Sequence, residues 1–176
     1  MKISELAQQL GINTCMEFDS SLLVPEWRVR DLCLENKCGN YGNNYMCPPH
    51  IGALNEVKPK LKKFHQGILF QYSQPVDARN DTRGVTRIKV DFHNKILQLE
   101  DCLKKDGIKD AWGLIGSSCA LCDVCKARTA SPCSYPDKAR TSLESLGVNV
   151  VALLDRFGLD SAFHMDMITW TGCILY

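Results

Sequence analysis

Apolar residues recur at helical spacing in two segments of the first half of the chain. Ile3, Leu6, Ala7 and Leu10 follow the i, i+3, i+4, i+7 pattern, and a glycine comes directly after them, where a helix commonly ends. Residues 54–64 carry a second helical stripe, which Pro59 should kink or mark as its first turn. Both segments are therefore predicted helices.

Two further helices are predicted in the second half. The clearest lies between about Gly84 and Lys105, where apolar residues recur at helical spacing up to a glycine stop. Another is expected to begin near Pro136 and to end at Gly147. It would carry its apolar residues on one face, namely Ala139, Leu143 and Leu146.

Short apolar or alternating runs between these helices predict strands. They are residues 12–18, 27–33, 67–73, 111–118 and 168–176, while residues 148–157 fit a helix or a strand. Strands that alternate with helices indicate an α/β or α+β fold, a small mixed sheet covered by helices. A chain of 176 residues with 45% hydrophobic content can bury one core, so residues 1–176 are expected to form a single domain.

The charge balance narrows the classes of partner. The chain has 21 basic and 20 acidic residues and a net charge of +1, which gives no electrostatic reason to expect nucleic acid or an anionic membrane as a partner. No apolar span is long enough to cross a bilayer, and the N-terminus lacks the apolar run of a secretory signal. We therefore expect a cytoplasmic protein.

The chain has ten cysteines, and the expected compartment decides which chemistry they are expected to have. Disulfides are rare in the reducing cytosol, and disulfide-dense scaffolds are usually short secreted chains without a core of their own. Clustered cysteines in a cytosolic chain more often bind metal or carry out redox chemistry.

Four cysteines lie close together in the stretch CALCDVCKARTASPC; these are Cys119, Cys122, Cys125 and Cys133, here called the second cysteine group. The first three form CxxCxxC, the spacing that begins the ligand run of bacterial ferredoxins, and this favours a [4Fe-4S] cluster. Zinc sites commonly use two separated CxxC pairs and do not need a third equally spaced cysteine. A thioredoxin-like dithiol would also leave that third cysteine unexplained.

The first cysteine group is Cys33, Cys38 and Cys47, in the stretch CLENKCGNYGNNYMCPP. Two prolines follow Cys47 and hold the chain extended, as the proline after a cluster ligand does. The glycines and asparagines before it can adopt positive φ and turn N–H groups toward anionic sulfur. A phosphate-binding loop is disfavoured, because no Lys-Ser/Thr pair completes the motif.

Both cysteine groups are expected in loops at strand ends, where they can meet in space. Together they supply one complete four-cysteine site and three ligands for another, or ligands that cross between two clusters. An iron with only three thiolates would leave a position for substrate. The isolated Cys15, Cys102 and Cys173 are expected to be small buried hydrophobic residues, and His50 a surface residue.

The chain resembles the family of predicted metal-binding proteins known as domain of unknown function 2284. The likeness rests on C…YGxxxxCPP from Cys38 to Pro49, on CxxCxxC from Cys119 to Cys125, and on the later segment PCSYPDKAR…SLESLGVNV. The resemblance implies a cysteine-ligated metal held by both cysteine groups. It does not imply a reaction.

The sequence therefore favours a protein with one or two [4Fe-4S] clusters that exchanges electrons with a redox partner protein. One alternative is a zinc-stabilised interaction module. The other is an enzyme that binds substrate at the open iron of a three-cysteine cluster.

Overall fold

The computed structural model describes residues 2–176 and has a four-stranded antiparallel sheet at its centre, in the order β1-β2-β4-β3. The two long central strands pair along their length, from Gly67 opposite Leu175 to Pro75 opposite Met167. The expected class of a small sheet covered by helices is confirmed, and the sheet is antiparallel throughout instead of mixed. The strands are β1 (Thr14–Asp19), β2 (Gln66–Pro75), β3 (Trp112–Leu114) and β4 (Met167–Leu175).

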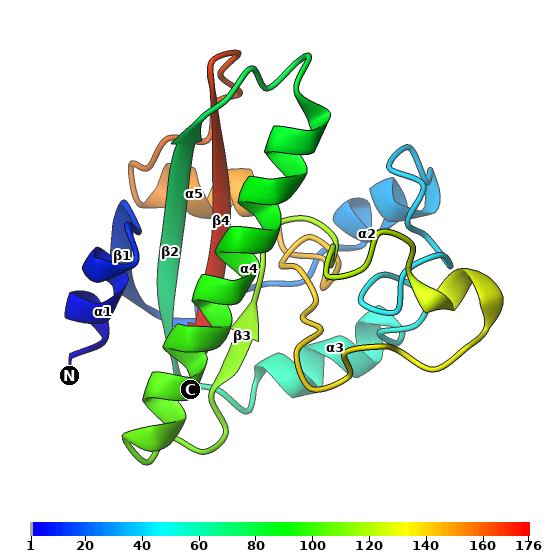
Figure 1. The fold of residues 1–176 in the computed structure, drawn as a ribbon. Coiled ribbons are helices and arrows are strands. Elements are labelled where there is room, and N and C mark those ends of the chain that lie inside the picture. Colours follow the sequence, from blue (N-terminus) through cyan, green and yellow to red (C-terminus); the bar gives the residue numbers. More distant parts are fainter. Residues whose placement is uncertain (1) are drawn as a thin grey trace.

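Helices cover both faces of this sheet. Figure 1 shows the long helix α4 crossing the face of β2 and β4, with α5 on the opposite side. Side chains cap two of these helices: Asp81 accepts a hydrogen bond from Gly84 N–H, and Asn149 accepts one from Ala152 N–H. The helices are α1 (Ile3–Gln9), α2 (Trp27–Leu34), α3 (Leu54–Leu61), α4 (Thr82–Lys105) and α5 (Val150–Arg156), with 3-10 turns η1 (Ser20–Leu22) and η2 (Lys126–Thr129).

Alternation along the strands divides the core into two clusters. In β2, Ile68 and Phe70 pack with the residues of α1 and α4, whereas Leu69 packs on the other face with α3, α5 and the segment before α5. In β4, Ile174 and Cys173 divide in the same way. The sheet therefore forms the middle layer between two layers of helix and turn.

The predicted strand at residues 27–33 is wrong, because this segment forms helix α2. Its inward residue is a polar one: Arg30 is only 9% exposed, whereas Trp27, Leu32 and Leu34 are all about 60% exposed. Apolar residues on the outer side and an arginine on the inner side invert the usual stripe of a helix. For this reason the hydrophobic pattern of residues 27–33 did not indicate a helix.

The predicted helix at residues 136–147 is also wrong, because the segment is a series of turns. Leu143 and Leu146 are buried against the sheet as the pattern required. The hydroxyl of Ser142, however, accepts a hydrogen bond from Ser145 N–H at 3.1 Å. Local bonds of this kind compete with the helical pattern, and the backbone follows them here.

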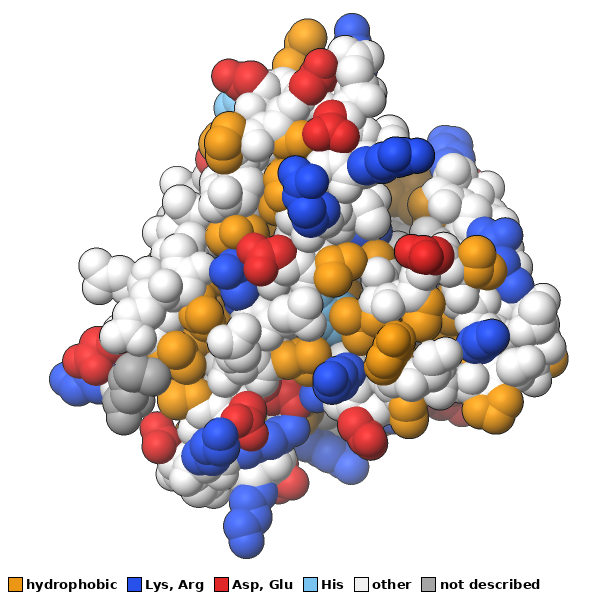
Figure 2. Space-filling model, in the orientation of Figure 1, with side chains coloured by type: hydrophobic (Ala, Val, Ile, Leu, Met, Phe, Trp, Pro, Cys, Tyr) orange, Lys and Arg blue, Asp and Glu red, His pale blue; other side chains and the backbone are white. Residues whose placement is uncertain are grey.

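The cysteine-bearing segments lie beside the sheet, with α2 and α3. In Figure 1 these segments, coloured blue to cyan and yellow, project to the right of α4. Figure 2 shows hydrophobic side chains, a class that includes cysteine in its colouring, spread over this part of the surface among charged ones. None of the helices within residues 2–176 has the length and apolar character needed to span a bilayer.

Candidate metal centre

Direct hydrogen bonds join the loops that carry the two cysteine groups. Asn44 Nδ2 donates to Cys119 O at 2.8 Å, and Asn40 Nδ2 donates to Ser118 Oγ at 3.3 Å. Tyr45 O–H donates to the carbonyl oxygen of Ser131 at 2.7 Å. The expectation that the two groups meet in space is confirmed, and side chains of the first loop make the contacts.

The first cysteine group spans three environments. Cys33 lies in the last turn of α2, Cys38 is exposed in the loop, and Cys47 is only 6% exposed. Positive φ angles occur at Asn36 (50°), Gly39 (72°) and, further along the loop, Gly42 (70°), as expected from the glycines and asparagines. Cys33 therefore belongs to a helix and not to the predicted strand.

The second cysteine group surrounds one cavity of about 20 Å³. All four cysteines of the group line the wall of this cavity, together with residues that include Tyr45 and Tyr135. The volume is enough for one water-sized particle. No three His, Cys, Asp or Glu side chains of residues 2–176 are arranged as ligands of one metal ion. None of the seven candidate cysteines of this described range forms a disulfide.

Hydrogen-bond donors point at two of the candidate sulfurs. The backbone N–H groups of Leu121 and Arg140 donate to Cys119, and the hydroxyl of Ser145 donates to Cys47 Sγ at 3.8 Å. Burial raises the pKa of Cys47 to about 11 and also raises the pKa of Cys119, while these donors act in the opposite direction. A bound metal reverses the effect of burial, because it ligates the thiolate form.

Two basic side chains beside the cysteines are buried or half-buried and have no carboxylate partner among residues 2–176. Arg30 donates to Ser145 O at 3.0 Å and to Gly52 O at 2.7 Å, and the acidic groups that act on its charge are the Cys33 thiol and then Tyr41. Lys89 of α4 is half-buried, with its ammonium 5.8 Å from the ring centroid of Trp170. The acidic groups that act on its charge are three thiols, those of Cys119, Cys47 and Cys38.

Unpaired cations at low solvent exposure are costly unless an anion offsets them. Thiolates bound to a metal would supply that negative charge. The all-sulfur donors, the N–H and O–H bonds to sulfur and the two cations fit a thiolate-ligated metal centre. Donor sets of this kind select zinc, copper(I) or iron–sulfur clusters.

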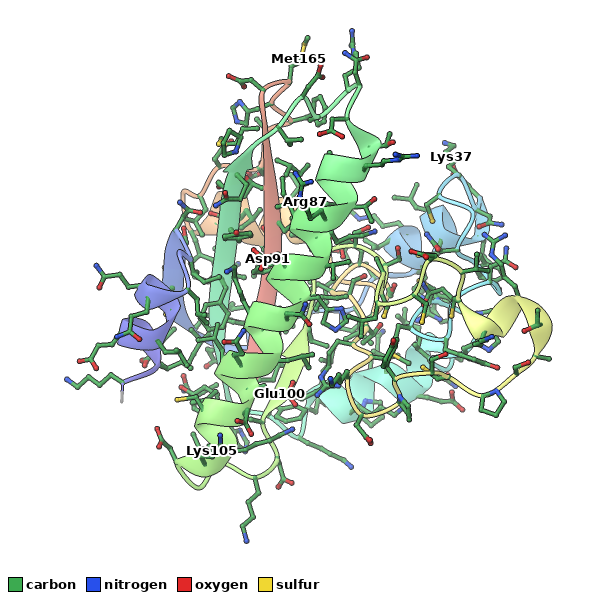
Figure 3. All side chains as sticks on the ribbon, in the orientation of Figure 1. Lys37, Arg87, Asp91, Glu100, Lys105 and Met165 are labelled. Atoms are coloured by element: carbon green, nitrogen blue, oxygen red, sulfur yellow. The ribbon has the colours of Figure 1, made fainter. Side chains whose placement is uncertain are left out.

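A buried ion-pair network joins Arg140, which follows the second cysteine group in the chain, to Glu100 of helix α4. Arg140 donates twice to the Glu100 carboxylate, with both distances 2.8 Å, and Lys104 and the Gly113 N–H donate to the same carboxylate. Burial raises the pKa of Glu100, but the bonds from Arg140 and Lys104 outweigh it and leave this pKa lowered. Figure 3 labels Glu100 on α4. The residue that supplies an N–H to Cys119 is therefore itself held by α4.

Comparison with known families decides the class of the chain. The model of a family described as predicted metal-binding protein (DUF2284) matches residues 16–176. The chain belongs to this family. The resemblance read from the cysteine motifs is confirmed, and metal binding is the property that the family description gives. No curated protein and no solved structure matches the chain.

Among the residues outside the family motifs, one cysteine differs from its sequence expectation. Cys173 is fully buried in β4, as expected, but Cys15 is exposed on the edge strand β1. His50 is exposed, also as expected. Sequence reasoning missed Arg30 and Lys89. The only signal for Arg30 is its position one helical turn before Cys33, and nothing in the pattern marks Lys89.

Proposed function

We propose that this protein carries one or two [4Fe-4S] clusters on its two cysteine groups and exchanges electrons with a redox partner protein in the cytoplasm. The observation that carries the proposal is the cavity lined by all four cysteines of the second group. Three of them have the ferredoxin spacing, and the first group lies beside them. The cluster, when bound, supplies one-electron redox chemistry.

The proposed ligands are the seven cysteines of the two groups, and the surrounding residues have separate tasks. The N–H groups of Leu121 and Arg140 bond to the sulfur of Cys119, and Ser145 bonds to that of Cys47. Such bonds stabilise the thiolate and raise the reduction potential of a cluster. Arg30 and Lys89 add positive charge on the same side and favour the reduced, more negative state.

A structural zinc site is the second candidate. The observation in its favour is the small cavity of the second cysteine group, about 20 Å³, with four thiols around it. Zinc takes four thiolates in a closed tetrahedral site and has no redox chemistry. It does not account for the third equally spaced cysteine or for the three cysteines of the first group.

The deciding experiment measures iron, acid-labile sulfide and zinc in protein purified without oxygen, with absorption spectra before and after dithionite. We expect about four or eight irons per chain, equal sulfide and a brown colour that dithionite bleaches. The matched variants are Cys125→Ser, which should lose iron, and Cys15→Ser on the exposed edge strand, which should keep it. Stoichiometric zinc without sulfide would reject the iron–sulfur proposal and establish the zinc site.

A further inference from the structure

A large cavity lies on the outer side of the first cysteine group. Its volume is about 810 Å³, and its walls come from α2, α5, β4 and the turns between them. Small-molecule sites in proteins usually have volumes of about 300–1,000 Å³ and mostly apolar walls. Leu32 of α2 and Val151 of α5 contribute apolar walls here, although both are more than half exposed to solvent.

Two side chains in the wall of this cavity have buried polar atoms without a hydrogen-bond partner among residues 2–176. They are Oε2 of Glu144 and Nε1 of Trp170. The backbone N–H groups of Glu144 itself and of Ser117 act on the Glu144 carboxyl. Of the three such atoms in the described chain, only that of His93 lies elsewhere. Buried polar atoms are nearly always paired in native proteins, so these two atoms call for a partner that the protein itself does not supply.

The charged groups at the rim of the cavity already have side-chain partners within the protein. Arg28 pairs with Glu26, Lys37 pairs with Glu35, and Asp160 pairs with His164 at 2.6 Å. Figure 3 labels Lys37 at the outer end of this region. A charged ligand would have to compete with these internal pairs, whereas a neutral one would not.

We propose that this cavity binds a small, neutral, largely apolar organic molecule that presents a carbonyl oxygen to the indole N–H of Trp170. Its apolar body lies between Leu32 and Val151, and a second polar group of the ligand meets the Glu144 carboxyl. Cys33 and Cys38 belong to the same wall, so the ligand lies next to the first cysteine group. The binding site stands on the cavity and its two unpartnered atoms, whichever metal the cysteines hold.

The test uses prodan, a neutral naphthalene ketone whose emission responds to hydrogen bonding at its carbonyl, titrated with metal-loaded full-length protein. Val151→Trp, which places an indole in the wall of the cavity, should weaken binding at least about tenfold, while Val24→Trp, a similarly exposed position outside it, should leave binding unchanged. Trp170→Phe keeps the ring under Lys89 but removes the N–H. It should weaken prodan binding about 3- to 10-fold.

The control ligand is dimethylaminonaphthalene, which lacks the carbonyl and should bind wild type and Trp170→Phe equally. Circular dichroism and metal content are measured on each sample, so loss of fold or of metal is separated from loss of ligand. The proposal is overturned if wild type shows no saturable binding, if Val151→Trp binds prodan as wild type does, or if Trp170→Phe changes neither ligand's affinity. None of these results would alter the metal assay that tests the proposed function.

Discussion

The two cysteine groups differ in how completely the protein encloses them. The second group has four cysteines around one small cavity, and its loop is tied to α4 through Arg140 and Glu100. The first group has three cysteines in three different environments, and Cys33 and Cys38 face a large cavity. The second group thus has four cysteines around one small cavity, and the first has two of its three cysteines in the wall of a large one. Similar cysteine content therefore does not give the two groups similar surroundings.

The largest expected effect comes from removing one ligand of the second group. Cys125→Ser should lose nearly all metal bound by that group, whereas Cys33→Ser should leave the second group loaded, as expected for two groups that hold separate centres. Metal and sulfide content per chain measures both. Equal and complete loss in the two variants would show that both groups hold a single shared centre, which would end the comparison.

Breaking the anchor of the second loop should have the next largest effect. Glu100→Gln leaves Arg140 and Lys104 without their buried counter-charge, and we expect the free energy of unfolding to fall by about 4 kcal/mol. The matched control is Asp101→Asn in the neighbouring exposed pair with Lys105, which should cost less than about 0.5 kcal/mol. Urea denaturation measures both. An equal effect of the two substitutions would contradict the anchoring role.

Low pH should lower the free energy of unfolding through His93, which lies on α4 as Glu100 does. This side chain is 1% exposed and bonds to the carbonyl of Lys138, and burial lowers its pKa to about 4. The unfolded chain therefore takes up the proton first, so stability falls as pH drops from about 6.5 to about 4, by roughly 3 kcal/mol. His93→Gln should remove this part of the pH dependence. Urea curves that shift equally with pH in both proteins would refute it.

The smallest expected effect is a change in reduction potential on removal of the positive charge of Lys89. Lys89 lies near thiols of each group, so Lys89→Met should lower the reduction potential of every cluster present by roughly 20–60 mV. Arg87→Met, on an exposed position of the same helix, is the control and should change it by less. Redox titration followed by absorbance gives the values. A shift confined to one centre would place Lys89 with that group alone.

The sequence predicted the parts of the fold that rest on plain apolar periodicity. The helix between Gly84 and Lys105 and the strands at residues 67–73 and 168–176 are confirmed as α4, β2 and β4. The misses are segments where polar side chains decide the backbone, as Arg30 does in α2 and Ser142 does in the turns before α5. A hydrophobic pattern carries no information about such bonds.

The candidate centre was predictable to a similar degree. Cysteine spacing identified the two groups and the family, and the positive φ angles of the first loop followed from its glycines. Lys89 and Glu144 were not predictable, because each reaches the cysteine region from a distant part of the sequence. Only the folded chain brings them there.

The side-chain bonds between the two cysteine loops bear on the order in which the protein is assembled. Asn40, Asn44 and Tyr45 hold the loops together through amide and hydroxyl groups, none of which is a metal ligand. In zinc fingers the metal itself drives folding. Because the three contacts between the loops involve no cysteine sulfur, the pairing of the two loops does not depend on a metal in the way that the fold of a zinc finger does.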